Sequence, residues 1–326
     1  MTADRADAQD AVDPLDQLQR LIDAEILPGS DLYTIDEVAA RAGADLATTR
    51  RLWRALGFAD PGPGDRMGGE FDVAVLKLVF DQDLTRVGVE NLIQQTRVMS
   101  AAISRITELW VDQVRVALDS GDPELVQSTA ELTTDQDRTM WMLGYMHRRL
   151  LAAGLRRELA NRSAGGGTEL SAVFADLVGF TTLTERLGPL ELSKLVGTFE
   201  AVAHDTIAEH GGRLVKTIGD EVLFAASDPA VAVEITVDLM RRAASSGLPP
   251  LRAGIDHGPT VSFEGDLFGS TVNRAARLVA EAPTGAIAAS TAVREAAGAH
   301  PWRELGVRHL KGVGDVRVQV LDVVAG

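Results

Sequence analysis

The spacing of apolar residues changes near residue 160, and this change limits the folds that the chain can adopt. From residue 32 to about residue 157, apolar residues recur at helical spacing. Beyond the change, short β-rich runs such as LSAVFADL and EVLFAA alternate with helical stretches. The segment NRSAGGGT between the two patterns has the composition of a flexible linker. We therefore predict an all-α domain at 31–160, a linker at 161–168 and an α/β domain at 169–326.

The composition excludes several classes of protein. The chain has 326 residues, which predicts two domains, and residues 1–30 are acidic and polar, so we expect a tail with one short helix. It contains no cysteine, which excludes disulfides and zinc–thiolate sites. The net charge of −15 opposes binding to nucleic acid. Because neither a signal-like leader nor a long apolar span is present, we expect a cytoplasmic protein without a transmembrane segment.

Residues 34–54 have the pattern of a helix-turn-helix, with a small residue and a Gly at the spacing that a tight helix pair needs. This pair would carry a basic face made of four arginines, Arg41, Arg50, Arg51 and Arg54. Two interpretations are open, a DNA-binding motif and an ordinary corner between two helices. Because the surrounding charge is strongly negative, we expect the second.

Two acidic residues lie where the α/β half should be apolar. Asp176 interrupts the strand-like run VFADLVGFT, and Asp220 follows Gly219 at the turn of a predicted hairpin, RLVKTIGDEVLF. A buried ionised carboxylate is costly unless it is paired or binds a cation. Each feature alone is common in turns. Two such carboxylates side by side would suit Mg²⁺ or Mn²⁺ in a two-metal phosphoryl-transfer centre.

A third polar group follows in the stretch GDLFGSTVNRAARL. A predicted loop carries Asp266, and the helix predicted after it carries Asn273 and Arg277 at positions i and i+4. This spacing places the last two on one helix face. An amide and a guanidinium on one face suit a ribose and a triphosphate.

These three stretches, together with LKGVGDV near the end of the chain, resemble the motifs of the class III nucleotidyl cyclases. The resemblance covers about residues 169–324, and the helical half resembles the regulatory domain of some soluble actinobacterial members. It implies a ferredoxin-like βαββαβ catalytic fold. It also implies an adenylyl cyclase, which converts ATP to 3′,5′-cyclic AMP and pyrophosphate.

The resemblance implies roles for individual residues. Asp176 and Asp220 match the metal-binding aspartates of the family, and the Leu177 carbonyl is expected to assist them. Each site would then hold two Mg²⁺ or Mn²⁺ ions. Lys216 and Asp266 match the pair that reads the purine, in its adenine-selecting form. In guanylyl members, Glu and Cys or Ser stand at these two positions.

Three further residues match groups that contact the nucleotide in the family. Asn273 matches the residue that orients the ribose, and Arg277 the one that stabilises charge at the α-phosphate. Lys311 matches a lysine near the β- and γ-phosphates. In the family, one chain provides the metal-binding aspartates and its partner provides the other residues. The resemblance therefore implies a homodimer with two equivalent sites.

The helical half is the expected regulator. Residues 139–159 lead into the linker, so we expect them to couple the two halves. His147 in this segment is a candidate proton switch near neutral pH, and a histidine simply packed on a helix face is the alternative. A small molecule or lipid bound in the helical half is a second class of effector. We expect Met140, Trp141 and Met146 to be core residues.

One alternative function stays open. The chain would then be a non-catalytic regulator that uses a cyclase-like domain to dimerise or to sense ATP, and its helix-turn-helix to bind DNA. Degenerate members of the resembling family lose their aspartates. Because Asp176 and Asp220 are both present, we favour the enzyme.

Overall fold

The computed structural model describes residues 19–20, 32–62, 64–81, 88–163 and 169–323. The chain divides into two compact units, Met1–Ala153 and Gly154–Gly326. The division falls inside one long helix, α8 (Gln136–Ser163). Most of the predicted tail and residues 164–168 of the predicted linker lie outside the described residues.

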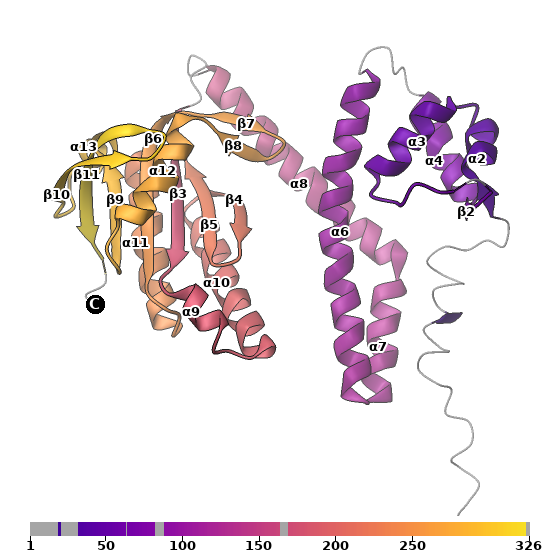
Figure 1. The fold of residues 1–326 in the computed structure, drawn as a ribbon, viewed down its shortest axis with the longest axis horizontal. Helices are drawn as coiled ribbons and strands as arrows, with labels where there is room; N and C mark the ends of the chain where they lie inside the picture. The colour runs from indigo at the N-terminus through magenta and orange to yellow at the C-terminus, as the bar shows by residue number, and fades with distance from the viewer. Residues whose placement is uncertain (1–18, 21–31, 63, 82–87, 164–168, 324–326) are drawn as a thin grey trace, which may run out of the picture. The chain divides into compact units, whose positions relative to one another are not determined.

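The first unit is helical, as the sequence predicts (Figure 1). Its other described helices are α2 (Ile35–Ala42), α3 (Leu46–Ala55), α4 (Glu70–Asp81), α6 (Val89–Ser120) and α7 (Pro123–Thr134). Several of these helices have a short polar residue as their N-cap. Thr34 and Glu37 form a capping box at the start of α2, and Asp122 caps α7 just before Pro123. Helices α2 and α3 are the pair that the pattern of residues 34–54 predicts.

The prediction that this unit is entirely α-helical is wrong in one place. Strand β1 (Tyr33–Thr34) pairs in antiparallel fashion with β2 (Arg66–Gly68). Strands of two and three residues are too short to show an alternating pattern. Their pairing joins segments about thirty residues apart in the sequence, so local spacing does not reveal it.

The second unit is built on a seven-stranded sheet in the order β10-β11-β9-β6-β3-β5-β4. The strands are β3 (Glu169–Leu177), β4 (Arg213–Ile218), β5 (Glu221–Ala226), β6 (Leu251–Pro259), β9 (Ala286–Ser290), β10 (Arg303–Leu310) and β11 (Gly314–Asp322). Only the β6–β9 pair among them is parallel. A separate hairpin, β7 (Val261–Phe263) with β8 (Asp266–Phe268), precedes helix α12 (Ser270–Glu281).

Helices cover both faces of this sheet. Along β3, Val173, Ala175 and Leu177 pack in one apolar cluster with α10 (Pro189–Glu209) and α11 (Pro229–Ser245), while Ala172 and Phe174 pack with α12 in another. The shorter helices are α9 (Phe180–Thr184) and α13 (Thr291–Ala296). This alternation is the period of a strand buried on both faces.

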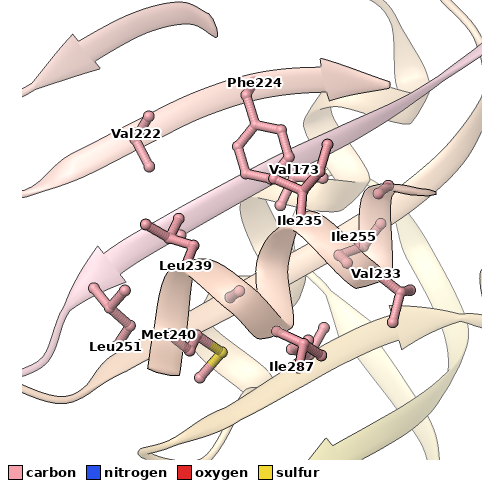
Figure 2. Close-up of a cluster of buried hydrophobic side chains, with 14 of the residues drawn as sticks. Val173, Val222, Phe224, Val233, Ile235, Leu239, Met240, Leu251, Ile255 and Ile287 are labelled. Carbon is pink, nitrogen blue, oxygen red and sulfur yellow. The ribbon is translucent and has the colours of Figure 1, made fainter. Parts of the chain in front are cut away.

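Figure 2 shows the larger cluster, in which Ile235 and Leu239 of α11 lie over Val173 of β3 and Phe224 of β5. A fully buried side chain of this size contributes about 1.5–3 kcal/mol to stability. The cluster fixes β3, β5 and β6 relative to one another, and β3 carries the predicted site residues Asp176 and Leu177. Among the described residues, no helix combines the length and apolar character that a membrane crossing requires.

Candidate active site

The structure brings together the two predicted metal-binding carboxylates. Asp176 lies near the end of β3, and Asp220 lies in the two-residue turn between β4 and β5, where Gly219 has a φ of 63°. The Leu177 amide donates a hydrogen bond to the Asp220 carbonyl at 3.0 Å, which ties the turn to β3. Burial raises the pKa of Asp220, and the adjacent Asp176 carboxylate raises it further.

A third carboxylate and one arginine also belong to this region, and the sequence interpretation missed both. Glu221 is the cross-strand neighbour of Asp176, and burial together with the charges of Asp176 and Asp220 raises its pKa. Arg252 of β6 is the neighbour of Asp176 on the other side. Its Nε and Nη2 atoms donate to Asp176 Oδ2 at 3.0 and 2.7 Å. Both residues are recognised as neighbours of Asp176 from the register of the paired strands. They were missed because a single sequence does not show this register.

The donor set fits a divalent cation of the hard-oxygen type. Asp176 and Asp220 place two carboxylates close together, and burial with the charge of Asp176 raises the pKa of Asp220, although Arg252 offsets part of the negative charge. Mg²⁺ and Mn²⁺ sites commonly use one or two carboxylates, with water and substrate phosphates as further ligands. Within the described parts of the chain, no group of three acidic or histidine side chains is arranged as a complete metal cage. The Leu177 carbonyl stays a predicted ligand.

The predicted purine-reading residues contact each other. Lys216 of β4 donates from Nζ to Asp266 Oδ2 at 2.5 Å, and both side chains are partly exposed. The Leu267 amide donates to Asp266 Oδ1 at 2.7 Å. Partial burial works to raise the pKa of Asp266, but the hydrogen bonds from Lys216 and Leu267 outweigh it and lower the pKa. The expectation that Asp266 lies in a loop is wrong, because it begins strand β8, which pairs with β7.

The two residues predicted to share a helix face do so. Asn273 and Arg277 are both exposed on α12, while Val272, Ala275 and Leu278 on the other side of the helix are buried. Among the described interactions, none links Asn273 or Arg277 with the carboxylate pair or with Lys216 and Asp266 of the same chain.

Lys311 is placed apart from Lys216, although its neighbour Leu310 packs with Leu278 of α12. It is exposed in the turn between β10 and β11, and β10 forms the edge of the sheet opposite to β4. Lys216 lies on β4, so the full width of the sheet separates these two strands.

Helix α8, which carries the candidate switch, has a largely exposed apolar surface. His147 is itself exposed, and its neighbour Leu150 is 73% exposed. The expectation that Met140, Trp141 and Met146 are core residues is wrong for the single chain, because all three are exposed, Trp141 by 70%. Helical spacing shows that a side of a helix is apolar, but it does not show what covers that side.

The arginines of the helix-turn-helix have acidic partners. Arg41 lies 3.8 Å from Glu70, and Arg51 lies 2.6 Å from Glu90. Arg50 forms two ion pairs, with Asp36 at 3.6 Å and with Asp60 at 3.5 Å. These carboxylates reduce the positive charge that this face would present to a phosphate backbone.

Comparison with known proteins identifies the family. A family model described as the adenylate and guanylate cyclase catalytic domain matches residues 166–321. A protein named adenylate cyclase from Streptomyces coelicolor is 36% identical over 300 residues, which cover 88% of this chain and 78% of the relative. Another of that name, from Streptomyces griseus, is 35% identical and covers 85% and 71%.

A third relative, from Mycobacterium tuberculosis, is named pH-sensitive adenylate cyclase; it is 31% identical over 304 residues, covering 86% of this chain and 76% of the relative. The chain therefore belongs to the family of the adenylate and guanylate cyclases, as its motifs suggest. The matches to these relatives extend beyond the catalytic domain into the helical unit.

Proposed function

We propose that this protein is an adenylyl cyclase that converts ATP to 3′,5′-cyclic AMP and pyrophosphate. The observation that carries the choice of nucleotide is the contact between Lys216 and Asp266. An ammonium donates to adenine N1, and a carboxylate accepts from the exocyclic amine, so this pair complements adenine. The relatives named adenylate cyclase support the same assignment.

The residues around the nucleotide have separate tasks in this proposal. Asp176 and Asp220, with the Leu177 carbonyl, would hold two Mg²⁺ or Mn²⁺ ions. Bound ions of this kind would activate the ribose 3′-hydroxyl and neutralise the leaving pyrophosphate. Asn273 orients the ribose so that the 3′-oxygen lies in line with the α-phosphorus. Arg277 stabilises the negative charge that develops at the α-phosphate.

The bond changes in this reaction balance without a further reactant. The 3′-oxygen forms a bond to the α-phosphorus as the bond from that phosphorus to the bridging oxygen breaks. The hydroxyl proton passes to water, and pyrophosphate leaves. Lys311 would contact the β- and γ-phosphates in the assembled site. Lys311 follows Leu310, which packs with Leu278 of α12 in the same chain, so Lys311 would act beside Arg277.

We further propose that the site is completed at a homodimer interface. In one chain, Asn273 and Arg277 are exposed and have no described interaction with the carboxylate pair. The strand order β6-β3-β5-β4, with antiparallel neighbours and helices α10 and α11 in the connections, supports the ferredoxin-like βαββαβ core that the resemblance implies.

The assay that tests this proposal uses the purified full-length chain with ATP and either Mg²⁺ or Mn²⁺. Cyclic AMP and pyrophosphate should appear in equal amounts, and the active species should have the mass of a dimer. A folded dimer that makes no cyclic AMP with either metal would favour a non-catalytic, ATP-sensing regulator. DNA binding gains little support, because three of the four candidate arginines have acidic partners.

We also propose that the helical unit regulates the catalytic unit through α8. This helix begins in the first compact unit and ends in the second. Near its end, Arg157 lies close enough to Arg213 of β4 for its charge to lower the pKa of Arg213, after the larger effect of burial. The effector would be a proton, acting on His147, or a small molecule or lipid. The name of the mycobacterial relative supports pH.

If the helical unit regulates catalysis, removal of residues 1–153 should change the rate of cyclic AMP formation. We expect full-length protein and residues 154–326 to differ at least about threefold in kcat, with a ratio that varies between about pH 5.5 and 8. A faster fragment would identify the helical unit as an inhibitor, and a slower one as an aid to dimer assembly.

Full-length His147→Gln should flatten the pH dependence, whereas His204→Gln on α10 should not. Identical rates and pH profiles for all four proteins would exclude regulation by a proton acting on His147.

A further inference from the structure

Strand β6 contacts α12, the helix that carries Asn273 and Arg277, through side chains on one face of the strand. The core residues Ala253 and Ile255 of β6 face the opposite way, toward α11. Gly254 and Asp256 alternate with them and face α12. These two residues contact α12 alongside the apolar packing of Val272, Ala275, Leu278 and Val279 of the helix against the sheet.

The first contact is a close approach of two backbones. A Cβ atom at Gly254 would lie 2.3 Å from the Ala275 carbonyl oxygen and 2.5 Å from the Val279 nitrogen. The absence of a side chain at Gly254 lets the helix rest directly on the strand. At the start of the helix, the Thr271 hydroxyl donates to the Pro259 carbonyl at 2.8 Å. These contacts set the distance of α12 from β6, and the buried apolar side of the helix gives it a preferred rotation, although apolar packing has little directional character.

The second contact is an ion pair between a buried carboxylate and a partly exposed arginine. Asp256 is only 2% exposed, and its Oδ2 accepts a hydrogen bond from Arg274 Nε at 2.6 Å. A buried carboxylate strongly requires such a partner. Arg274 directly follows Asn273 and precedes Arg277 by three residues, so its direction fixes the direction of both. The pair thus adds a directional contact to the apolar packing, and the two together hold α12 at one rotation about its axis.

We propose that Asp256 and Arg274 are positioning residues, which orient Asn273 and Arg277 toward the nucleotide. This inference rests on the proposed function, because it takes Arg277 as the residue that stabilises the α-phosphate. Side-chain tips lie about 5 Å from a helix axis, so a rotation of about 20° moves them by about 2 Å. A displacement of about 1 Å is enough to cost about a hundredfold in rate.

Arg274→Met in the full-length protein is expected to lower kcat about 10- to 100-fold, with the KM for ATP changed less than about threefold. Arg274→Lys, which keeps the charge, should recover most of this loss. The control is Arg303→Met, which makes the same substitution in an exposed ion pair with Asp322, at 2.9 Å between β10 and β11, and should leave kcat unchanged. Size-exclusion chromatography and thermal melting establish that each variant is folded and dimeric.

Because Arg274→Met leaves Asp256 buried without a partner, that variant can fail to fold. The double variant Asp256→Leu with Arg274→Met removes both charges and preserves apolar packing. We expect it to fold and to show the same loss of kcat. If the folded double variant keeps the kcat of the original protein, the ion pair has no positioning role and the inference is overturned.

A second measurement separates positioning from general damage. In an Arg277→Ala background, Arg274→Met should lower kcat by a clearly smaller factor than it does alone, since the residue that it positions is already missing. Equal factors in both backgrounds would overturn the inference. If Arg277→Ala alone keeps full kcat, the assignment of Arg277 in the proposed function fails instead, so the two failures are distinguishable.

Discussion

Replacing Asp220 with Asn is expected to lower the rate of cyclic AMP formation about a thousandfold or more, without loss of the fold. Asn has nearly the same shape as Asp but lacks the charge that binds a divalent cation, and a proposed two-metal site depends on both carboxylates. Burial and the neighbouring Asp176 raise the pKa of Asp220. Ionised Asp220 therefore lowers the stability of the folded protein when no metal is bound. The Asn variant should therefore melt at the same temperature as the original protein or slightly higher.

The rate with ATP is measured at several Mn²⁺ concentrations. Asp238→Asn is the matched control, because Asp238 lies on α11 and pairs there with Arg242 and His210. It should retain normal activity. An Asp220→Asn protein within about tenfold of the normal rate would contradict the assignment of Asp220 as a metal ligand.

The second large effect is expected in the choice between ATP and GTP as substrate. Lys216→Glu combined with Asp266→Cys is expected to lower kcat/KM for ATP about a hundredfold or more and to raise the preference for GTP by a similar factor. A buried hydrogen-bonding group that meets the wrong partner costs about 1–3 kcal/mol, and the double change reverses the pattern at two positions. It also removes the contact at 2.5 Å between Lys216 and Asp266.

The ratio of kcat/KM for ATP to that for GTP is the informative quantity, because general damage lowers both values together. Asp266→Asn alone serves as the control for loss of the ion pair without reversal of the pattern, and it should weaken ATP use without favouring GTP. If the double variant keeps the original ratio, Lys216 and Asp266 do not read the base.

The sequence predicted those parts of the site whose signals are local. Asp176 is recognisable because a charge in an apolar strand needs a partner, and Asn273 and Arg277 because a spacing of four residues places them on one helix face. The hairpin that presents Asp220 is likewise visible in the run of residues around Gly219. The domain types, helical and then α/β, follow from the period of the apolar residues.

Parts that depend on pairing between distant segments could not be predicted. Arg252 meets Asp176 only because β3 and β6 pair in one register, and Asp256 meets Arg274 only because Gly254 lets α12 approach β6. The β1–β2 ladder was missed for the same reason. The exposed apolar surface of α8 was misassigned to the core, since spacing does not show whether the same chain covers an apolar surface.

The central claim, a site shared between two chains, is tested most directly by mixing two inactive variants. Asp220→Asn and Arg277→Ala chains with different affinity tags are produced together, and heterodimers are isolated with both tags. Each heterodimer should contain one intact site and one doubly impaired site, so its cyclic AMP formation should be about half that of the original dimer. Each homodimer should stay nearly inactive. Isolated heterodimers that are as inactive as both homodimers would contradict a shared site and place all of these residues in one chain's own site.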